Sequence, residues 1–321
     1  MDFLANYFSS LNPMSFLSAL PGNIAQGIIW GLMGLGVFLT FKLLNFADLS
    51  VDGSFATGGA VTAVMLINGC PVWATIIVAI LAGLAAGLVT GLLHTLLGIP
   101  DILAGILTQI ALYSINLNIM GKSNLPISYR NYTLVVSASN INMAILVGLG
   151  ICAVVVAAMY WYFGTEQGST IRSTGSNPAM SKAQGININF TKVIALALSN
   201  GLVALSGSLF AQYQGFADIN MGRRAIVIGL AAVIIGEVLG EAIFRKHMNF
   251  IIRMLFVIVG GILYYIAMGI VLWLKMPTDD TKLFTAIIVA IFLAVPYLQK
   301  KRKTSFKKVA KMNAKNAQKE G

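Results

Sequence analysis

Residues 44–61 read LNFADLSVDGSFATGGAV and interrupt a chain that is strongly apolar on both sides of them. The stretch holds Asn45, Asp48 and Asp52 together with three glycines. Ionisable groups inside a membrane are costly and mark functional positions, and a glycine-interrupted apolar segment indicates a broken helix along a transport path. The three polar residues are therefore candidates to line or gate such a path. The alternative is that Asp52 only caps the following helix and that Asp48 lies in water.

The composition excludes an ordinary soluble domain. Of the 321 residues, 57% are hydrophobic and 10% are charged, and the mean hydropathy is +0.82. Soluble domains carry about 25% charged residues, which they need to cover their surface. A protein whose solvent is lipid does not need them, so the sequence predicts an all-α, polytopic membrane helix bundle.

Apolar runs that can cross a bilayer need about 17–25 residues each. The chain contains about nine of them, and the pattern also allows eight or ten. They cover residues 23–43, 53–67, 72–93, 102–120, 143–163, 190–213, 225–244, 250–274 and 283–298. The preceding segment, 1–22, is broken by Asn12, Pro13 and Pro21, which predicts an interfacial segment ahead of a membrane domain over 23–299.

Basic residues are concentrated at the C-terminus. The formal net charge is +11, and residues 300–321 contain nine Lys or Arg and one acidic residue. A basic tail directly after an apolar span is typical of a cytoplasmic flank, and it gives no reason to expect a nucleic-acid partner. We expect a multi-pass plasma-membrane protein, embedded in lipid, with a cytoplasmic C-terminus.

Motifs for catalysis, metal binding and nucleotide binding are missing from the sequence. HExxH and GxSxG do not occur, and both cysteines lie in apolar surroundings. Gly121-Lys122-Ser123 does not complete a Walker A loop, because Asn116 stands where that loop needs its first glycine. We therefore expect a protein that is not an enzyme and that binds no cofactor or metal itself.

The loop over residues 164–190 has clear local chemistry. Within STIRSTGSNPAMSKAQGININ (169–189), Asn177 is a good N-cap, Pro178 fits the first helical position, and Gly185 suits the residue after the helix end. These residues predict a short helix of about seven residues, roughly 10 Å long. It is either a connector that packs on the bundle or a docking helix for a cytoplasmic partner.

The loop pattern resembles that of permease subunits of ABC importers in the branched-chain amino acid, ribose and nucleoside group, and the resemblance extends over residues 24–298. In that family the loop forms a coupling helix that inserts into the ATPase subunit. The family usually has alanine at the position of Ser181. The resemblance implies that ATPase coupling falls to Arg172, Gly175, Asn177, Pro178, Met180, Ser181, Lys182 and Gly185.

Three further stretches resemble a narrower subgroup of the same family. LNFADLSVDGSF (44–55), HTLLGIPDILAGILT (94–108) and ALYSINLNIMG (111–121) are most similar to permeases linked to uptake of aromatic amino acids, tryptophan or tyrosine. The implied cargo is a small nutrient, an aromatic or branched-chain amino acid. The alternatives are an importer of nucleosides or sugars, and an ion-coupled secondary transporter, for which Asp48 and Asp52 would be the ion site.

The resemblance also implies an assembly. It consists of two permease copies, a cytoplasmic ABC ATPase dimer that binds ATP and Mg²⁺, and an extracytoplasmic substrate-binding protein. A homodimer of permeases is the simpler expectation, and a pair with a paralogue is the alternative. Substrate would pass along the permease interface while ATP binding and hydrolysis drive alternating access.

Polar residues elsewhere in the spans add candidates for the path. Gln109, Tyr113 and Asn116 share one helix face by their spacing, so they face either a path or hydrogen-bonding partners on another helix. Arg223 and Arg224 precede an apolar span at the predicted outer side. They contact a substrate carboxylate, pair with an acid, dock the binding protein or anchor the span.

Two glutamates lie one turn apart near the cytoplasmic end of the span 225–244. Glu237 and Glu241 are within reach of Arg245 and Lys246 along the same helix, which predicts salt pairing at the membrane surface. A role in an inner gate or in ATPase contact is the alternative.

Overall fold

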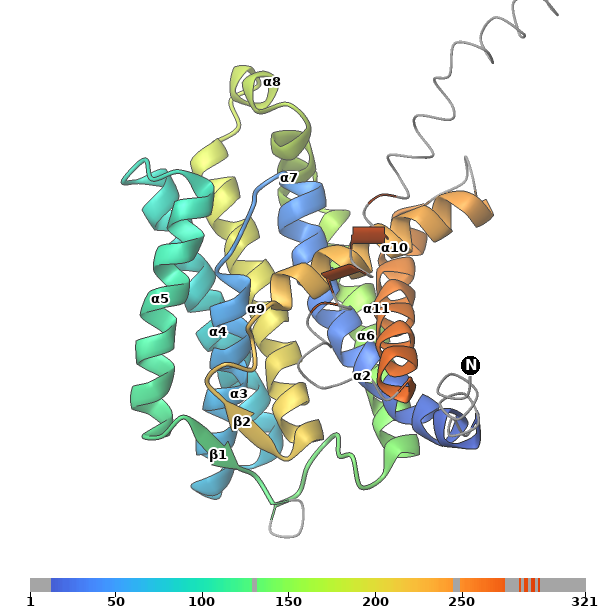
Figure 1. Ribbon diagram of the computed structural model, residues 1–321. Coiled ribbons are helices and arrows are strands. Elements are labelled where there is room, and N and C mark those ends of the chain that lie inside the picture. Colours follow the sequence, from blue (N-terminus) through green and yellow to red (C-terminus); the bar gives the residue numbers. More distant parts are fainter. Residues whose placement is uncertain are drawn as a thin grey trace, which may run out of the picture.

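The computed structural model describes residues 13–128, 132–244 and 249–274, together with single positions between 283 and 294. The described chain is a helix bundle with one small sheet at the end opposite α8 (Figure 1). Its elements are α2 (Pro13–Val37), η1 (Phe38–Leu43), α3 (Val51–Ile67), α4 (Val72–Thr95), α5 (Asp101–Met120), β1 (Asn124–Pro126), α6 (Ile141–Phe163), α7 (Glu166–Ser176), α8 (Pro178–Ala183), α9 (Ile188–Gln214), β2 (Phe216–Asp218), α10 (Ala225–Phe244) and α11 (Phe250–Trp273). The predicted all-α membrane bundle is confirmed.

Seven helices in the described part of the chain are long and apolar enough to cross a membrane. One of them joins α2 and the π-helix η1 into a single span of 31 residues. The helix α3 has 17 residues and is shorter than these seven. The predicted span 283–298 and the basic tail 300–321 fall mostly or wholly outside the described residues, so the predicted total of nine spans stays a prediction.

The first span begins earlier than the sequence predicted. Residues 13–22 were expected to form an interfacial segment that ends at Pro21, but α2 starts at Pro13 and runs through Pro21 without a break. Proline is tolerated inside membrane helices because neighbouring groups satisfy the freed backbone positions. The helix therefore starts ten residues before the predicted boundary at residue 23, and an interfacial position of residues 13–22 stays a prediction. The predicted interfacial residues 1–12 lie outside the described residues.

Two segments of the chain repeat one arrangement in opposite directions (Figure 1). In the first, α2 and η1 run toward the end of the bundle that carries α8, residues 44–50 turn back, and α3 continues from mid-height toward the opposite end. In the second, α9 runs away from α8, residues 215–224 turn back, and α10 starts at mid-height. Inverted repeats with discontinuous helices are typical of membrane transporters.

The packing of the two segments repeats in the same way. The helix α4 packs on α3 and on α9, and its counterpart α11 packs on α10 and on α2. The strands β1 and β2 pair antiparallel, with Leu125 opposite Ala217, and close the end opposite α8. The inverted relation therefore extends from the broken helices to the helices that support them.

Asp52 joins the two broken helices. Its carboxylate lies in the first turn of α3 and accepts hydrogen bonds from the backbone N–H of Arg224, at 3.1 Å, and of Ile226, at 2.9 Å. These amides stand at the start of α10, where a helix has no internal acceptors for them. The cap expected for Asp52 exists, but it belongs to α10 and not to α3.

Glycines let the supporting helices approach closely. A Cβ at Gly31 of α2 would lie 2.9 Å from the Cα of Ile258 on α11, and one at Gly87 of α4 would lie 2.7 Å from the Cα of Ala197 on α9. Both distances are too short for a real side chain, so these positions require glycine. Close backbone contact supplies dispersion energy. This energy drives the association of helices in lipid, because the hydrophobic effect does not act between apolar surfaces there.

We expect Gly87→Ala to lower the free energy of unfolding by about 1–3 kcal/mol, because the methyl group overlaps α9. The matched control is Gly150→Ala on the exposed face of α6, where an added Cβ meets nothing within 4 Å. That variant should gain up to about 1 kcal/mol from helix propensity. Thermal unfolding of the two purified variants measures the difference, and equal shifts would show that the α4–α9 contact is not tight.

Asp52→Ala should cost about 1–3 kcal/mol of stability, because it leaves two amides at the start of α10 without an acceptor, one of them partly buried. Asp101→Ala is the control, since Asp101 also lies in a first helical turn but its bond to the N–H of Ile102 is exposed. Chemical unfolding of both variants in detergent should show the larger loss for Asp52. Equal losses would mean that the Asp52 bonds do not stabilise the junction.

Candidate functional site

A cavity of about 350 Å³ lies between the start of α3, α5 and the segment before α10. We call it the α5 cavity. Its lining includes the predicted path residues Asp52, Gln109, Tyr113, Asn116 and Arg223. The predicted shared face of α5 is thereby confirmed in its geometry. The side chain of Asn116 is 1% exposed, and both polar atoms of its amide lack a hydrogen-bond partner among the described residues.

A second cavity, of about 800 Å³, lies on the other side of the same segment. We call it the aromatic cavity, because rings from α2, the end of α9, β2 and α11 line it together with polar residues of 218–224. Asn220 and Arg223 line both cavities. The lining is Trp30, Phe210, Gln214, Phe216, Asp218, Asn220, Met221, Arg223, Arg224, Val227, Ile228, Tyr264, Tyr265 and Met268.

Sequence reasoning missed the aromatic part of this lining. Trp30, Phe210 and Tyr264 lie inside long apolar spans, where an aromatic residue is normally part of the core. Only the nearby Arg223 and Arg224 were polar enough to be noticed. No periodicity in one span could reveal that the rings of three helices converge.

Two predicted path residues line neither cavity. Asn45 is an exposed residue in the left-handed region, at φ 55°, where the chain turns back after η1. Asp48 is 2% exposed, accepts from the backbone N–H of Ser50 at 2.9 Å, and accepts from the amide of Asn200 on α9 at 2.8 Å. Asp48 therefore ties residues 44–50 to α9. Its burial does not agree with the alternative expectation that Asp48 lies in water.

The short helix α8 has the predicted geometry. The side chain of Asn177 accepts from the N–H of Met180 at 3.1 Å, Pro178 is the first helical residue, and Gly185 has a φ of 83°. The helix spans six residues, and it projects from the bundle at one end (Figure 1). Met180 is 58% exposed, an unusual state for a methionine on a helix this short.

Three of the predicted coupling residues make contacts within the chain, although Arg172 is also exposed. Ser181 is 1% exposed and donates to the carbonyl of Asn177. The guanidinium of Arg172 donates to the carbonyl of Phe163 at 3.0 Å. Gly175 packs so closely on the carbonyl of Leu43 that a Cβ would overlap it. These residues hold the loop on the bundle, while Met180 and Lys182 lie on its exposed surface.

The helix α7 was not predicted. Thr165 caps it by accepting from the N–H of Gly168 at 3.4 Å, and Glu166 follows in the first turn. Its buried residues Gly168, Ile171 and Thr174 recur every third position. The sequence contains sufficient signals to predict this helix, namely a threonine cap, an acid in the first turn and this spacing. They were overlooked because the segment is highly polar.

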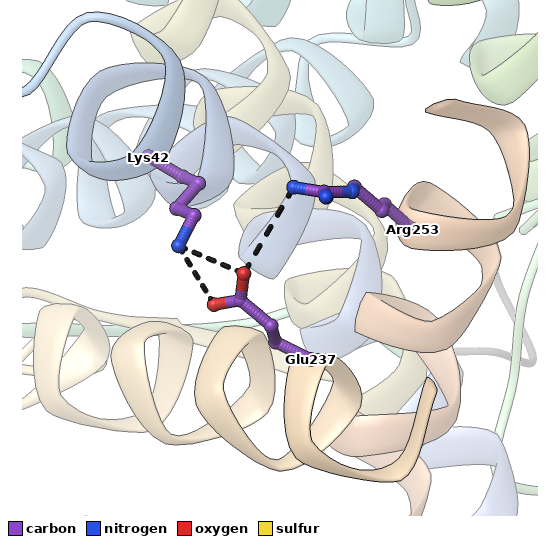
Figure 2. Close-up of polar contacts among 3 residues, drawn as sticks. All are labelled: Lys42, Glu237 and Arg253. Carbon is purple, nitrogen blue, oxygen red and sulfur yellow. Dashed lines mark hydrogen bonds and ion pairs between the residues drawn. The ribbon is translucent and has the colours of Figure 1, made fainter. Parts of the chain in front are cut away.

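Three charges meet where η1, α10 and α11 come together, and Figure 2 shows them. The ammonium of Lys42 lies 2.8 Å from a carboxylate oxygen of Glu237, and the guanidinium of Arg253 lies 4.0 Å from the same oxygen. The predicted partners Arg245 and Lys246 lie outside the described residues. The observed partner Lys42 belongs to the other inverted segment, so this cluster links the two. Glu241 is exposed.

The described residues contain no group of three or more His, Cys, Asp or Glu side chains placed to hold a metal ion. The buried carboxylate of Asp48 and the partly exposed carboxylate of Asp52 are occupied by hydrogen bonds from the chain itself. The polar lining of the two cavities includes amides, phenol groups and arginines together with the carboxylates of Asp52 and Asp218. Such groups bind and orient a small polar molecule.

Comparison with known proteins gives a consistent result. The chain is 42% identical over 301 residues to a tyrosine transport system permease protein of Clostridioides difficile, and the match covers 93% of this chain and 99% of that protein. A ribose import permease protein of Haemophilus influenzae is 28% identical over 63% of this chain and 64% of that one. The solved structure of PsaBC from Streptococcus pneumoniae in complex with a Fab has a similar fold, with a TM-score of 0.51 at 17% identity, over 90% of this chain and 94% of that one.

A family model covers nearly the whole membrane bundle. The model of the permease component of branched-chain amino acid transport systems matches residues 22–296. Its extent agrees with the resemblance that the loop pattern suggested. The chain is thus a multi-pass membrane transport subunit and not an enzyme, and it belongs to the family of branched-chain amino acid transport system permease components.

Proposed function

We propose that this chain is the permease of an ATP-driven importer of an aromatic amino acid, with tyrosine as the leading candidate. The observation that carries the proposal is the 42% identity to a tyrosine transport system permease over almost the full length of both chains. The ribose and nucleoside permeases are less similar or match a smaller share of the chain, at 28% over 63% and 34% over 27%. Sugars and nucleosides are therefore the second choice.

The proposed path runs along the junction of the two broken helices. The start of α3, the polar face of α5 and the segment before α10 present Asp52, Gln109, Tyr113, Asn116 and Arg223 to one cavity. Broken helices at the middle of a bundle are where transporters place their substrate sites. An ion-coupled mechanism is less well supported, because Asp48 and Asp52 already accept hydrogen bonds from the chain.

The helix α8 is proposed to dock on the ATPase, and a continuous set of contacts leads from it to the path. The helix α8 contacts α7, and Gly175 of α7 packs on the carbonyl of Leu43 at the end of η1. The returning segment that begins at Leu44 leads directly to Asp52. A displacement of α8 would therefore reach the junction of α3 and α10 through packed backbone.

The partners follow from the same proposal. A second permease copy, an ABC ATPase dimer with its ATP and Mg²⁺, and an extracytoplasmic binding protein complete the assembly. The end of the bundle with α8 is cytoplasmic, which agrees with the basic tail at 300–321 being inside. The sheet of β1 and β2 then lies on the outer side, where a binding protein would dock.

The function is tested with proteoliposomes that contain the chain together with its ATPase and binding protein. Labelled L-tyrosine should accumulate only when ATP is supplied, and unlabelled L-tyrosine should compete better than ribose or adenosine. The control is a liposome without the permease. Uptake that persists without ATP and stops when the ion gradient is removed would disprove the proposal.

Replacing Asn177 and Pro178 by glycines should abolish coupled uptake, because α8 loses its cap and its fixed first turn. The matched control is Asn187→Gly, which removes a similar cap, at 3.1 Å from the N–H of Phe190, from the nearby start of α9. Loss of one cap is a small perturbation for α9, which has 27 residues, and a large one for α8, which has six, so the control should transport almost normally.

The exposed surface of α8 provides a second variant that does not depend on helix stability. Met180→Asp should weaken binding of the ATPase subunit, since Met180 is exposed and its exchange leaves the cap in place. Co-purification of the ATPase and the ratio of ATP hydrolysed to substrate imported measure the effect. Unchanged coupling in both the glycine variant and Met180→Asp would contradict the docking role.

A further inference from the structure

The aromatic cavity combines buried rings with exposed cations. Trp30, Phe210 and Tyr264 are 3%, 6% and 1% exposed, whereas Arg223 and Arg224 are exposed. Its volume of about 800 Å³ is within the range of small-molecule sites, roughly 300–1,000 Å³. The α5 cavity is smaller, and its lining includes one ring, that of Tyr113.

The rings form one connected cluster around Trp30. The centroid of Trp30 lies 5.3 Å from that of Phe210, with the two rings edge to face, and 5.9 Å from that of Tyr265. The indole also stacks on Phe55 at 4.7 Å, and Phe55 does not line the cavity. Phe55 therefore supports the indole from behind, and Tyr265, which is partly exposed, is the ring of this cluster with the most free surface for a further ring.

Two buried polar atoms of the lining lack partners. The indole Nε1–H of Trp30 has no acceptor among the described residues, and the side-chain oxygen of Asn220 has no donor there. Buried polar groups are normally paired, because an unpaired one costs free energy. Neither atom is accessible to water, so a molecule in the cavity would pair with them only where the two side chains turn toward it.

The charges of the lining are of both signs. In the described part of the chain, neither Arg223 nor Arg224 forms an ion pair within 4.0 Å with a carboxylate. Asp218 also lines the cavity, and its carboxylate accepts from the N–H of Asn220 at 2.7 Å. Two free guanidinium groups beside one carboxylate fit a zwitterion, whose carboxylate meets the arginines and whose ammonium meets the acid.

We propose that the aromatic cavity holds the transported molecule and that it selects an α-amino acid with an aromatic side chain. This proposal rests on the importer function above and assigns the recognition to this chain as well as to any binding protein. The ring of the amino acid stacks among Trp30, Phe210 and Tyr265. Its carboxylate binds Arg223 and Arg224, and its ammonium donates to Asn220 and Asp218.

The test uses Trp30 as its own reporter in the permease–ATPase complex, without a binding protein. The chain has four tryptophans, so exchanging Trp73, Trp161 and Trp273 for phenylalanine leaves Trp30 as the only one in this chain, and the same complex with Trp30→Phe gives the emission of the ATPase to be subtracted. Titration with L-phenylalanine or L-tyrosine should change the emission of Trp30 saturably, and L-alanine should not. Phenethylamine, which lacks the carboxylate, should bind at least about tenfold more weakly than L-phenylalanine.

Two variants separate the ring contact from the charge contact. Tyr265→Leu should weaken binding of L-phenylalanine about tenfold, whereas Tyr265→Phe, which keeps the ring, should bind almost normally. The double change Arg223→Gln and Arg224→Gln should weaken L-phenylalanine and leave phenethylamine unchanged. The controls are Tyr160→Leu on α6 and Lys122→Gln, both exposed positions outside the cavity.

The outcomes for the cavity and for the importer function can be told apart. ATP-driven uptake of tyrosine by the wild-type assembly tests the function, and the Trp30 titration tests the site. If uptake is normal but Trp30 does not respond to aromatic amino acids, or Tyr265→Leu binds as well as Tyr265→Phe, the site is refuted and the function stands. Thermal unfolding of each variant confirms that a loss of binding is not a loss of fold.

Discussion

The hydrogen bonds between the carboxylate of Asp52 and the first amides of α10 hold the two inverted segments together. In lipid, each unpaired backbone group costs several kcal/mol, so a helix that begins at mid-height needs an acceptor at its start. Asp52 supplies it from the first turn of the other broken helix, at 2.9 and 3.1 Å. The start of α10, and with it the segment that borders both cavities, is therefore attached to one side chain of α3.

The supporting helices differ from this junction in how they are held. The pairs α4–α9 and α2–α11 pack backbone on backbone at glycines. Such close packing holds the two helices of each pair in one relative position. The junction has a close glycine contact as well, that of Gly222 with the carbonyl of Asp52, and adds to it the hydrogen bonds of Asp52 and the Lys42–Glu237–Arg253 cluster (Figure 2).

Much of this structure could be predicted from the sequence. The features that could not be predicted share one physical reason. Hydropathy located the spans and the Asn177 cap predicted α8, because both signals depend on neighbours along the chain. The partner of Asp52, the partner of Glu237 and the ring cluster at Trp30 depend on residues far apart in sequence. The spacing on α5 predicted the shared face correctly. The cavity that this face lines could not be predicted, because its other walls come from distant parts of the chain.

Asn220 and Arg223 border both cavities, so the short segment that carries them is a partition between two water-accessible spaces. Gly222 in this segment packs on the carbonyl of Asp52 too closely for any side chain, and Arg224 is held at a φ of 71° while its amide binds the same residue. A membrane must keep its ion gradients while it admits a nutrient. In the proposed path, a partition held to Asp52 at two neighbouring residues would limit leakage of protons and ions until those contacts break.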